Sequence, residues 1–259
     1  MKLEVLLAVV VILGIVSVVV FVDYLTLPKA TTPKERVILD VISYKSYSES
    51  DIVDFYVTAG EVSNNFSNNV KSIRINITYY NEEDYIIGSN SARAELEILK
   101  PNQKAPFRAY STLKSLQEIP ARAELSCDGL VVDEQPIEGI DITVGSGGTD
   151  AYGYYVITGE IKNNAPSKIS GLKVVSTYYD SEGGVILVSH AFPNSSALNV
   201  GDKSPFELSS KPHMIDASSY ELSIVASYAQ IFDMRYPLFF AFVIIAVAYI
   251  LYMKRYKGW

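Results

Sequence analysis

The chain is 259 residues long, 49% hydrophobic and 12% aromatic, with a formal net charge of −7 at pH 7. This composition can bury substantial cores, and the acidic balance argues against a nucleic-acid partner, which requires a basic surface. The single cysteine, Cys127, excludes an intrachain disulfide and a cysteine-rich metal site, so each folded part depends on its own core. Because Cys127 follows the strand-like stretch Ala123–Ser126, we expect a small buried thiol; an intermolecular disulfide is the alternative.

The N-terminal region, residues 1–23, is predicted to be a membrane anchor. Val5–Val22 is a run of 18 residues with nothing more polar than Gly14 and Ser17, which as a helix spans about 27 Å, nearly the thickness of a bilayer core. A secretory signal peptide is the alternative, but its apolar region is usually shorter, and no small-x-small cleavage site follows the run. Residues 24–34, rich in proline and threonine, then form an extended linker.

Residues 35–128 are predicted to form a β-sandwich domain. Short apolar or alternating stretches, separated by turn-forming residues, are expected to be its strands: Arg36–Ile42, Asp54–Val62, Ile73–Tyr80, Tyr85–Ile87, Ala92–Leu99, Phe107–Tyr110 and Arg122–Cys127. About seven short strands without a competing helical period are typical of a sandwich. Residues 129–140, which include a proline, are predicted to be an inter-domain linker.

Residues 141–229 are predicted to form a second β-sandwich. Its expected strands are Tyr154–Ile161, Leu172–Tyr179, Val185–Ser189, Phe206–Leu208 and Tyr220–Tyr228. The glycine-rich stretch Gly145–Gly148 lacks the Gly-Lys-Ser/Thr ending of a phosphate-binding loop, so we interpret it as a flexible turn.

The two predicted domains are copies of one unit. The offsets Gly159 − Gly60, Tyr178 − Tyr79 and Phe206 − Phe107 all equal 99 residues, so the copies align without a gap. The residues of the repeat signature are Gly60, Asn64, Tyr79, Tyr80, Pro106 and Phe107 in the first copy, and Gly159, Asn163, Tyr178, Tyr179, Asp180, Pro205 and Phe206 in the second. Between them, Ile73, Ile75, Ile77 and Tyr79, like Leu172, Val174, Ser176 and Tyr178, follow the period of two of a half-buried strand.

A second membrane span is predicted at residues 236–254, followed by a basic tail, residues 255–259. The apolar run Pro237–Met253 is bracketed by aromatic residues and followed at once by Lys254, Arg255 and Lys257. Under the positive-inside rule these three charges place the C-terminus in the cytoplasm, and with two spans the N-terminus lies there too. Both β-domains then face outward, at the cell surface.

Three Asn-x-Ser/Thr triplets, at Asn65, Asn76 and Asn194, are N-glycosylation acceptors if the domains face outward. Asn76 lies on the outward phase of its strand, which gives mild support to that orientation.

The order Gly-Glu-Val-x-Asn-Asn, an amphipathic strand ending in Tyr-Tyr-Asp, and Gly-Asp-Lys-Ser-Pro-Phe resembles the prokaryotic FxLYD-type domain of bacterial and archaeal envelope proteins. Tyr179-Asp180 matches the end of that motif, and Tyr80-Asn81 matches it less well. The Phe position of the motif holds Ile77 and Ser176, and its Leu position holds Tyr79 and Tyr178. The resemblance implies tandem immunoglobulin-like sandwiches in an envelope protein, with an archaeal source expected, and carries over no catalytic residue.

The residues for catalysis are sparse. His190 and His213 lack a second ligand at metal spacing, and no nucleophile elbow occurs, so we predict no enzymatic activity, cofactor or metal. The acidic turns at Glu82–Asp84 and Asp180–Glu182 could offer oxygens to calcium, but hairpin tips are commonly acidic for solvation alone. The predicted function is a surface protein that binds, spaces or scaffolds; an extracytoplasmic accessory subunit of an enzyme or transporter complex is the alternative. Expected partners are the membrane and envelope proteins or a surface layer, and homo-oligomerisation stays open.

Overall fold

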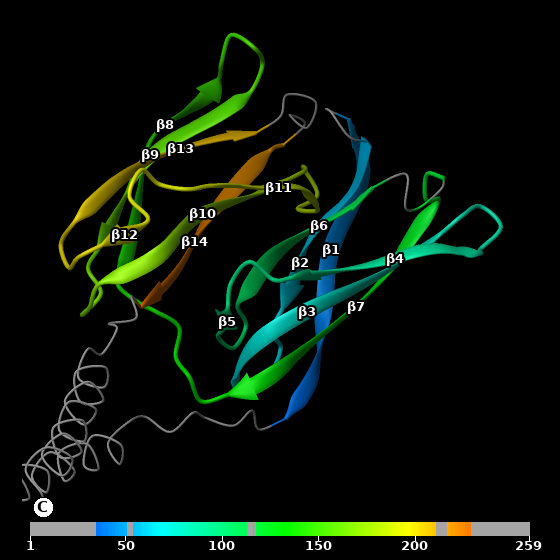
Figure 1. Cartoon of the computed structure of the whole chain (residues 1–259), viewed down its shortest axis with the longest axis horizontal. Helices are drawn as coiled ribbons and strands as arrows, with labels where there is room; N and C mark the ends of the chain where they lie inside the picture. The colour runs from blue at the N-terminus through cyan, green and yellow to red at the C-terminus, as the bar shows by residue number, and fades with distance from the viewer. Residues whose placement is uncertain (1–34, 51–53, 113–115, 117, 211–216, 229–259) are drawn as a thin grey trace, which may run out of the picture. The chain divides into compact units, whose positions relative to one another are not determined.

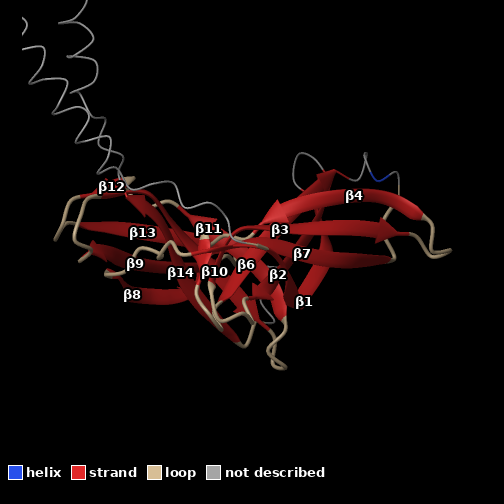
Figure 2. Cartoon of the chain, turned by 90° about the horizontal axis from the view of Figure 1, so that it is seen from below, coloured by secondary structure: helices blue, strands red, loops and turns tan. Residues whose placement is uncertain are grey.

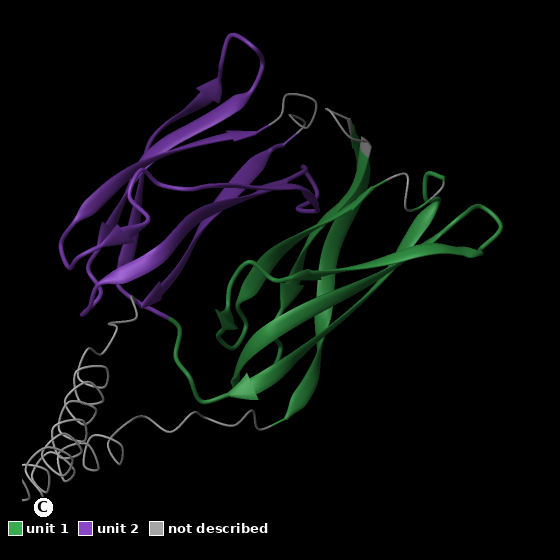
Figure 3. Cartoon of the chain, in the orientation of Figure 1, with its two compact units in different colours: residues 1–136 green, residues 137–259 purple. Residues whose placement is uncertain are grey.

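A computed structural model describes residues 35–50, 54–112, 116, 118–210 and 217–228 (Figure 1). The described part contains fourteen β-strands, joined by turns and loops (Figure 2), so the chain is mainly β, as predicted. It divides into two compact units, unit 1 (Met1–Pro136) and unit 2 (Ile137–Trp259), which Figure 3 shows in different colours.

Unit 1 contains seven strands in a single connected antiparallel arrangement. The strands are β1 (Arg36–Ser50), β2 (Asp54–Ser63), β3 (Asn69–Tyr80), β4 (Ile86–Arg93), β5 (Ile98–Leu99), β6 (Lys104–Thr112) and β7 (Arg122–Val132). Their order is β4-β3-β7-β1-β2-β6, and β5 pairs with β3.

Strand β1 joins the two layers of unit 1. Its first residues, Arg36–Leu39, pair with β7, and its remainder, from Asp40 onward, pairs with β2, with a register shift after Val41. The layer of β4, β3 and β7 faces the layer of β2 and β6, because the ring of Tyr79 from β3 meets the ring of Tyr56 from β2 at 5.6 Å. Unit 1 is therefore β-sandwich-like, with one strand shared between its two sheets.

The period of two predicted for β3 is confirmed. Ile73, Ile75 and Ile77 are at most 2% exposed, whereas Arg74 and Asn76, which alternate with them, are exposed. Each fully buried isoleucine stabilises the fold by about 1.5–3 kcal/mol relative to an exposed one.

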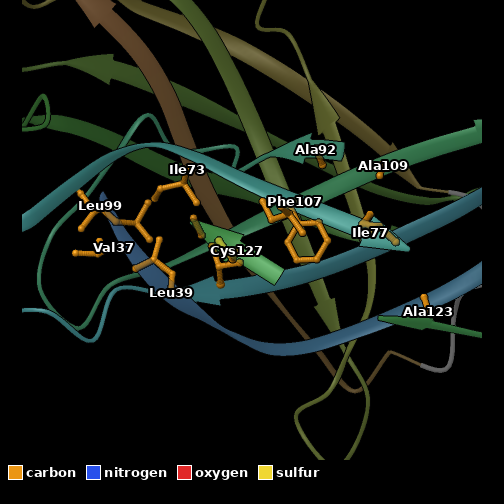
Figure 4. Packing of buried hydrophobic residues seen from close by; sticks show 14 of the residues in the cluster. Val37, Leu39, Ile73, Ile77, Ala92, Leu99, Phe107, Ala109, Ala123 and Cys127 are labelled. Carbon is orange, nitrogen blue, oxygen red and sulfur yellow. The ribbon is translucent and has the colours of Figure 1, made fainter. Parts of the chain in front are cut away.

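The core that these isoleucines enter also contains Val37, Leu39, Phe107 and Cys127 (Figure 4). Cys127 is only 2% exposed, and burial raises the pKa of its thiol to about 12. The predicted small buried thiol is confirmed.

Unit 2 contains two separate antiparallel sheets. Its strands are β8 (Ile140–Thr149), β9 (Tyr155–Asn163), β10 (Ile169–Tyr179), β11 (Val185–Ala191), β12 (Ala197–Leu198), β13 (Lys203–Ser210) and β14 (Ser219–Tyr228). One sheet has the order β13-β9-β8; in the other, β10 pairs with β11 and β12 on one side and with β14 on the other. The two sheets face each other, since the ring of Tyr178 from β10 meets that of Tyr155 from β9 at 6.3 Å.

Two sequence-based predictions about loops are wrong. Gly145–Gly148 is not a flexible turn but part of β8, where Ser146, Gly147 and Gly148 pair with β9 around a bulge after Val144. Backbone groups make these pairs, so the absence of side chains does not prevent them. Likewise the first residues of the predicted linker 129–140 are strand, because β7 continues to Val132, which pairs with Asn69 and is 2% exposed.

Among the described residues, none forms a helix long and apolar enough to cross a membrane. The two predicted spans, residues 1–23 and 236–254, lie outside the described residues, as do the linker 24–34 and the basic tail 255–259.

Candidate interaction surface

Most residues of the repeat signature hold the fold of their own unit together. Asn64 is fully buried, and its side-chain amide donates to the carbonyl oxygens of Asn68 at 2.8 Å and Leu99 at 3.0 Å. Its side-chain oxygen accepts the backbone N–H of Phe66 at 3.0 Å. Asn163 makes the same three bonds in unit 2, at 2.9 to 3.0 Å. One amide thus fixes two loops in each unit.

The shared tyrosines bridge the two layers through hydroxyl groups. Tyr79 is fully buried, and its hydroxyl lies 3.1 Å from Thr58 Oγ1 and 3.4 Å from Ser111 Oγ. In unit 2 the hydroxyl of Tyr178 lies 2.7 Å from Ser210 Oγ, and burial raises the pKa of Tyr178. Because a buried hydroxyl without a partner is costly, these pairs fix how the layers are aligned.

Asp180 organises a hairpin turn. Its Oδ1 accepts the backbone N–H groups of Glu182 at 2.9 Å and Gly184 at 2.8 Å. Asn81, its counterpart in unit 1, accepts those of Glu83 and Tyr85 in the same way. No group of three or more histidine, cysteine or acidic residues that could hold a metal occurs in the described part of the chain.

Of the two histidines, the structure describes His190. His190, on β11, is exposed and packs against the ring of Phe192 at 5.6 Å between centroids. His213 lies outside the described residues.

One exposed face of unit 1 carries polar and charged side chains from three adjacent strands, and we call it the polar face. Its residues are Arg74, Asn76, Thr78 and Tyr80 from β3, Ser89, Ser91 and Arg93 from β4, and Arg122, Glu124, Ser126 and Asp128 from β7. They lie on one face because directly opposed residues of antiparallel strands point the same way.

At one end of the polar face, Arg122 is the centre of a cluster. Its guanidinium stacks over the ring of Tyr80 at 3.8 Å and donates to Asp84 at 2.7 Å and Glu124 at 2.8 Å. The Tyr80 hydroxyl donates to Glu124 at 2.8 Å; this bond raises the pKa of Tyr80 and, together with the bond from Arg122, lowers the pKa of the Glu124 carboxyl. The sequence analysis did not predict this cluster, although Tyr80 belongs to the repeat signature.

At the other end, two exposed arginines are direct cross-strand neighbours. Arg74 lies opposite Arg93 on β4 and opposite Asp128 on β7, and Asp128 accepts a bond from Arg36 at 2.5 Å. Like charges placed directly opposite each other destabilise a sheet slightly. The pair therefore places two positive charges side by side at this end of the polar face.

The corresponding face of unit 2 has a different character. Val175 and Val188 occupy the positions of Asn76 and Ser89, and they are 0% and 1% exposed. The copies thus share their interior bonds and differ in the side chains on this face.

The three predicted acceptor asparagines are exposed. Asn65 donates its side-chain amide to Asp40, Asn76 lies in the middle of the polar face, and the backbone N–H of Asn194 donates to Pro205 at 3.0 Å. A glycan on Asn76 would cover the polar face. The predicted topology determinants Lys254, Arg255 and Lys257 lie outside the described residues.

No known protein family matches the chain, and neither does any curated protein. Similar solved structures include the exo-chitosanase CsxA of Amycolatopsis orientalis, at 14% identity over 71% of this chain and 26% of that chain, with a TM-score of 0.25. Bacteroides uniformis β-glucuronidase 2 is 10% identical over 76% of this chain and 31% of that chain, with a TM-score of 0.23. Red sea bream transglutaminase is 8% identical over 73% and 31%, with a TM-score of 0.22.

The chain spans about a quarter to a third of the length of these proteins.

Proposed function

We propose that this chain is a cell-surface protein, anchored by two membrane spans with both termini in the cytoplasm, whose immunoglobulin-like sandwiches act as a non-enzymatic binding, spacing or scaffold module. The observation that carries the proposal is the contrast between the copies. Asn64 and Asn163 make the same interior bonds, whereas the same strand position holds an exposed Asn76 in unit 1 and a fully buried Val175 in unit 2. A duplicated framework that exposes polar side chains on this face in unit 1 alone suits recognition by surface contact.

The membrane part of the proposal is supported by the sequence. Val5–Val22 and Pro237–Met253 are apolar enough to span, and Lys254, Arg255 and Lys257 favour a cytoplasmic C-terminus. The resemblance of both copies to FxLYD-type domains supports an outward location in a prokaryotic, archaeal envelope.

Topology is tested on intact cells or right-side-out spheroplasts that carry a C-terminal tag on the full chain. Added protease should digest the β-domains while the tag survives. Protected domains with a digested tag would reverse the orientation.

Binding by the polar face is tested by gentle detergent solubilisation and mass spectrometry of co-purifying proteins. The double variant Arg74→Glu/Arg93→Glu should lose partners that the wild type retains. The matched control, Lys45→Glu/Lys168→Glu, makes the same charge change at two other exposed positions and should retain them. Equal partner sets for both variants would exclude the polar face as the binding surface.

The second candidate is an accessory subunit of a membrane enzyme or transporter complex. It is favoured by the presence of two predicted spans, since one suffices for an anchor and two offer lateral contacts in the bilayer. Neither apolar run contains a charged residue, so a substrate pathway through them is not proposed. Co-purification of a multi-span membrane protein in fixed stoichiometry, unaffected by Arg74→Glu/Arg93→Glu, would favour this candidate.

A further inference from the structure

Among the described residues, strand β14 of unit 2 pairs along one edge only, whereas the equivalent strand of unit 1 pairs along both; we call the other edge of β14 its free edge. In unit 1, β7 lies between β3 and β1. In unit 2, β14 pairs with β10, and no other strand among the described residues occupies its second edge. The positions correspond, because Ile75 pairs with Cys127 and its counterpart Val174 pairs with Ile224.

The free edge has a local cause at the start of unit 2. In unit 1, Leu39 of β1 pairs with Cys127 before β1 continues along β2. In unit 2, the chain enters β8 through Gly139, which has φ of +81° and whose carbonyl accepts the N–H of Asn164 at 2.7 Å. This segment is thus bonded to the loop between β9 and β10 and does not pair with β14.

The uncovered edge has few of the features that normally prevent strand pairing. Ile224 is half-buried, whereas Cys127, the corresponding residue of the covered strand, is 2% exposed. Ser219–Tyr228 contains a single charge, Glu221, and neither lysine nor proline. Edge strands are usually protected by such residues, so β14 is suited to receive another strand.

We propose that the β14 edge is an interaction surface and that its occupant is β14 of a second copy, paired antiparallel about a two-fold axis. The inference goes beyond the proposed function and holds with or without a membrane anchor. Unit 1 gives an example of this pairing, because β1 lies antiparallel along the equivalent edge of β7.

The sequence of β14 is self-complementary in this pairing. With Ile224 on the two-fold axis, Leu222 lies opposite the partner's Ala226, and Ser223 lies opposite the partner's Val225. Apolar residues then meet on the side of the sheet that faces the core, where Val37 and Leu39 of unit 1 are buried. Glu221 lies opposite the partner's Ser227, so the two glutamates are about 20 Å apart, too far for strong repulsion. A two-fold pairing of one patch with itself also closes and does not propagate.

The test measures the mass of the full chain in detergent, against 28.6 kDa for one copy. The wild type should be a dimer. S223K/V225K places ammonium groups directly opposite each other across the pairing and should be a monomer, whereas S167K/S209K, with the same added charge at two exposed serines of unit 2, should stay dimeric.

A cysteine pair tests the register without disturbing the edge. I224C brings two thiols together at the two-fold axis and should give a covalent dimer on mild oxidation, well above the yield for S209C. A monomeric wild type, or equal cross-linking of both cysteine variants, would overturn the proposal. A stoichiometric complex of one copy with a different protein, lost in S223K/V225K, would overturn the choice of a second copy as occupant.

Discussion

Gly60 lies directly opposite Phe107 in the β2–β6 pair, and the phenyl ring covers the position that a side chain on Gly60 would take. A Cβ there would lie 2.8 Å from Phe107 Cζ and 2.4 Å from the backbone oxygen of Ser43. Gly159 and Phe206 repeat the relationship in unit 2, with 2.6 Å between the built Cβ and the ring. The glycine and phenylalanine of the repeat signature therefore form one packing unit in each domain.

Replacing Gly60 with alanine should destabilise unit 1 by about 2–4 kcal/mol, because backbone at 2.4 Å must move to admit a methyl group. The measurement is the denaturant midpoint followed by circular dichroism. Gly148→Ala is the control, since nothing lies within 4 Å of its built Cβ, and it should be neutral or slightly stabilising. Equal midpoints for the two variants would show that the ring does not confine position 60.

Asn64→Ala should destabilise unit 1 by about 2–4 kcal/mol, because three backbone groups lose a buried partner. Asn199→Ala is the matched control: its amide bonds Asp202 at the surface, and its loss should cost about 0.5 kcal/mol or less. The measurement is the loss of unfolding free energy in each variant, from thermal and chemical unfolding. A small effect at Asn64 would mean that water replaces the amide.

Ser72→Gly should stabilise unit 1 by about 0.5–1 kcal/mol. Ser72 has φ of 54° in a bulge of β3, where its counterpart in unit 2 is Gly171 with φ of 63°. A left-handed conformation costs a non-glycine residue about 1–2 kcal/mol, more than the entropy that glycine adds to the unfolded chain. Ser126→Gly, at an exposed strand position without positive φ, should change stability in the opposite direction. If both variants destabilised unit 1, the positive φ of Ser72 would not be a source of strain.

Cys127 should react with iodoacetamide at pH 8 at least about 1000-fold more slowly in the native chain than in urea. The factor follows from the pKa of about 12 against 9.0 for an ordinary thiol, three units, since the thiolate is the nucleophile. The raised pKa also makes the free energy of unfolding depend on pH. The stability that the neutral thiol contributes is complete below pH 9 and declines as pH rises toward 12. Cys127→Ala should lessen that decline. Rapid native labelling would show that the thiol is accessible.

Sequence periodicity predicted β3 because its inner positions are apolar and their neighbours mostly polar, so local pattern and burial coincide. In β10 the same period predicted a half-buried strand, but Val175 and Thr177 on its other face are buried as well. It did not predict β8, because Gly145, Gly147 and Gly148 have no side chains to show a period, and their pairing is made by the backbone. The sequence pattern also did not predict that β1 is divided between two sheets. Each half has the pattern of an ordinary strand, and only the partner strands differ.

For the candidate surface, the repeat signature identified framework residues. The polar face depends on cross-strand register, which brings Arg74, Arg93 and Asp128 together from distant parts of the sequence.

The attachment of the first strand also decides how each unit resists mechanical load. Tension applied along β1 must shear its pairs with both β7 and β2, whereas tension along β8 acts against β9 alone. Resistance to shear grows with the number of backbone hydrogen bonds that must break together. We therefore expect unit 2 to unfold at a lower force than unit 1. A chain stretched between its ends should lengthen in two steps, with unit 2 giving way first and unit 1 holding its fold to the higher force.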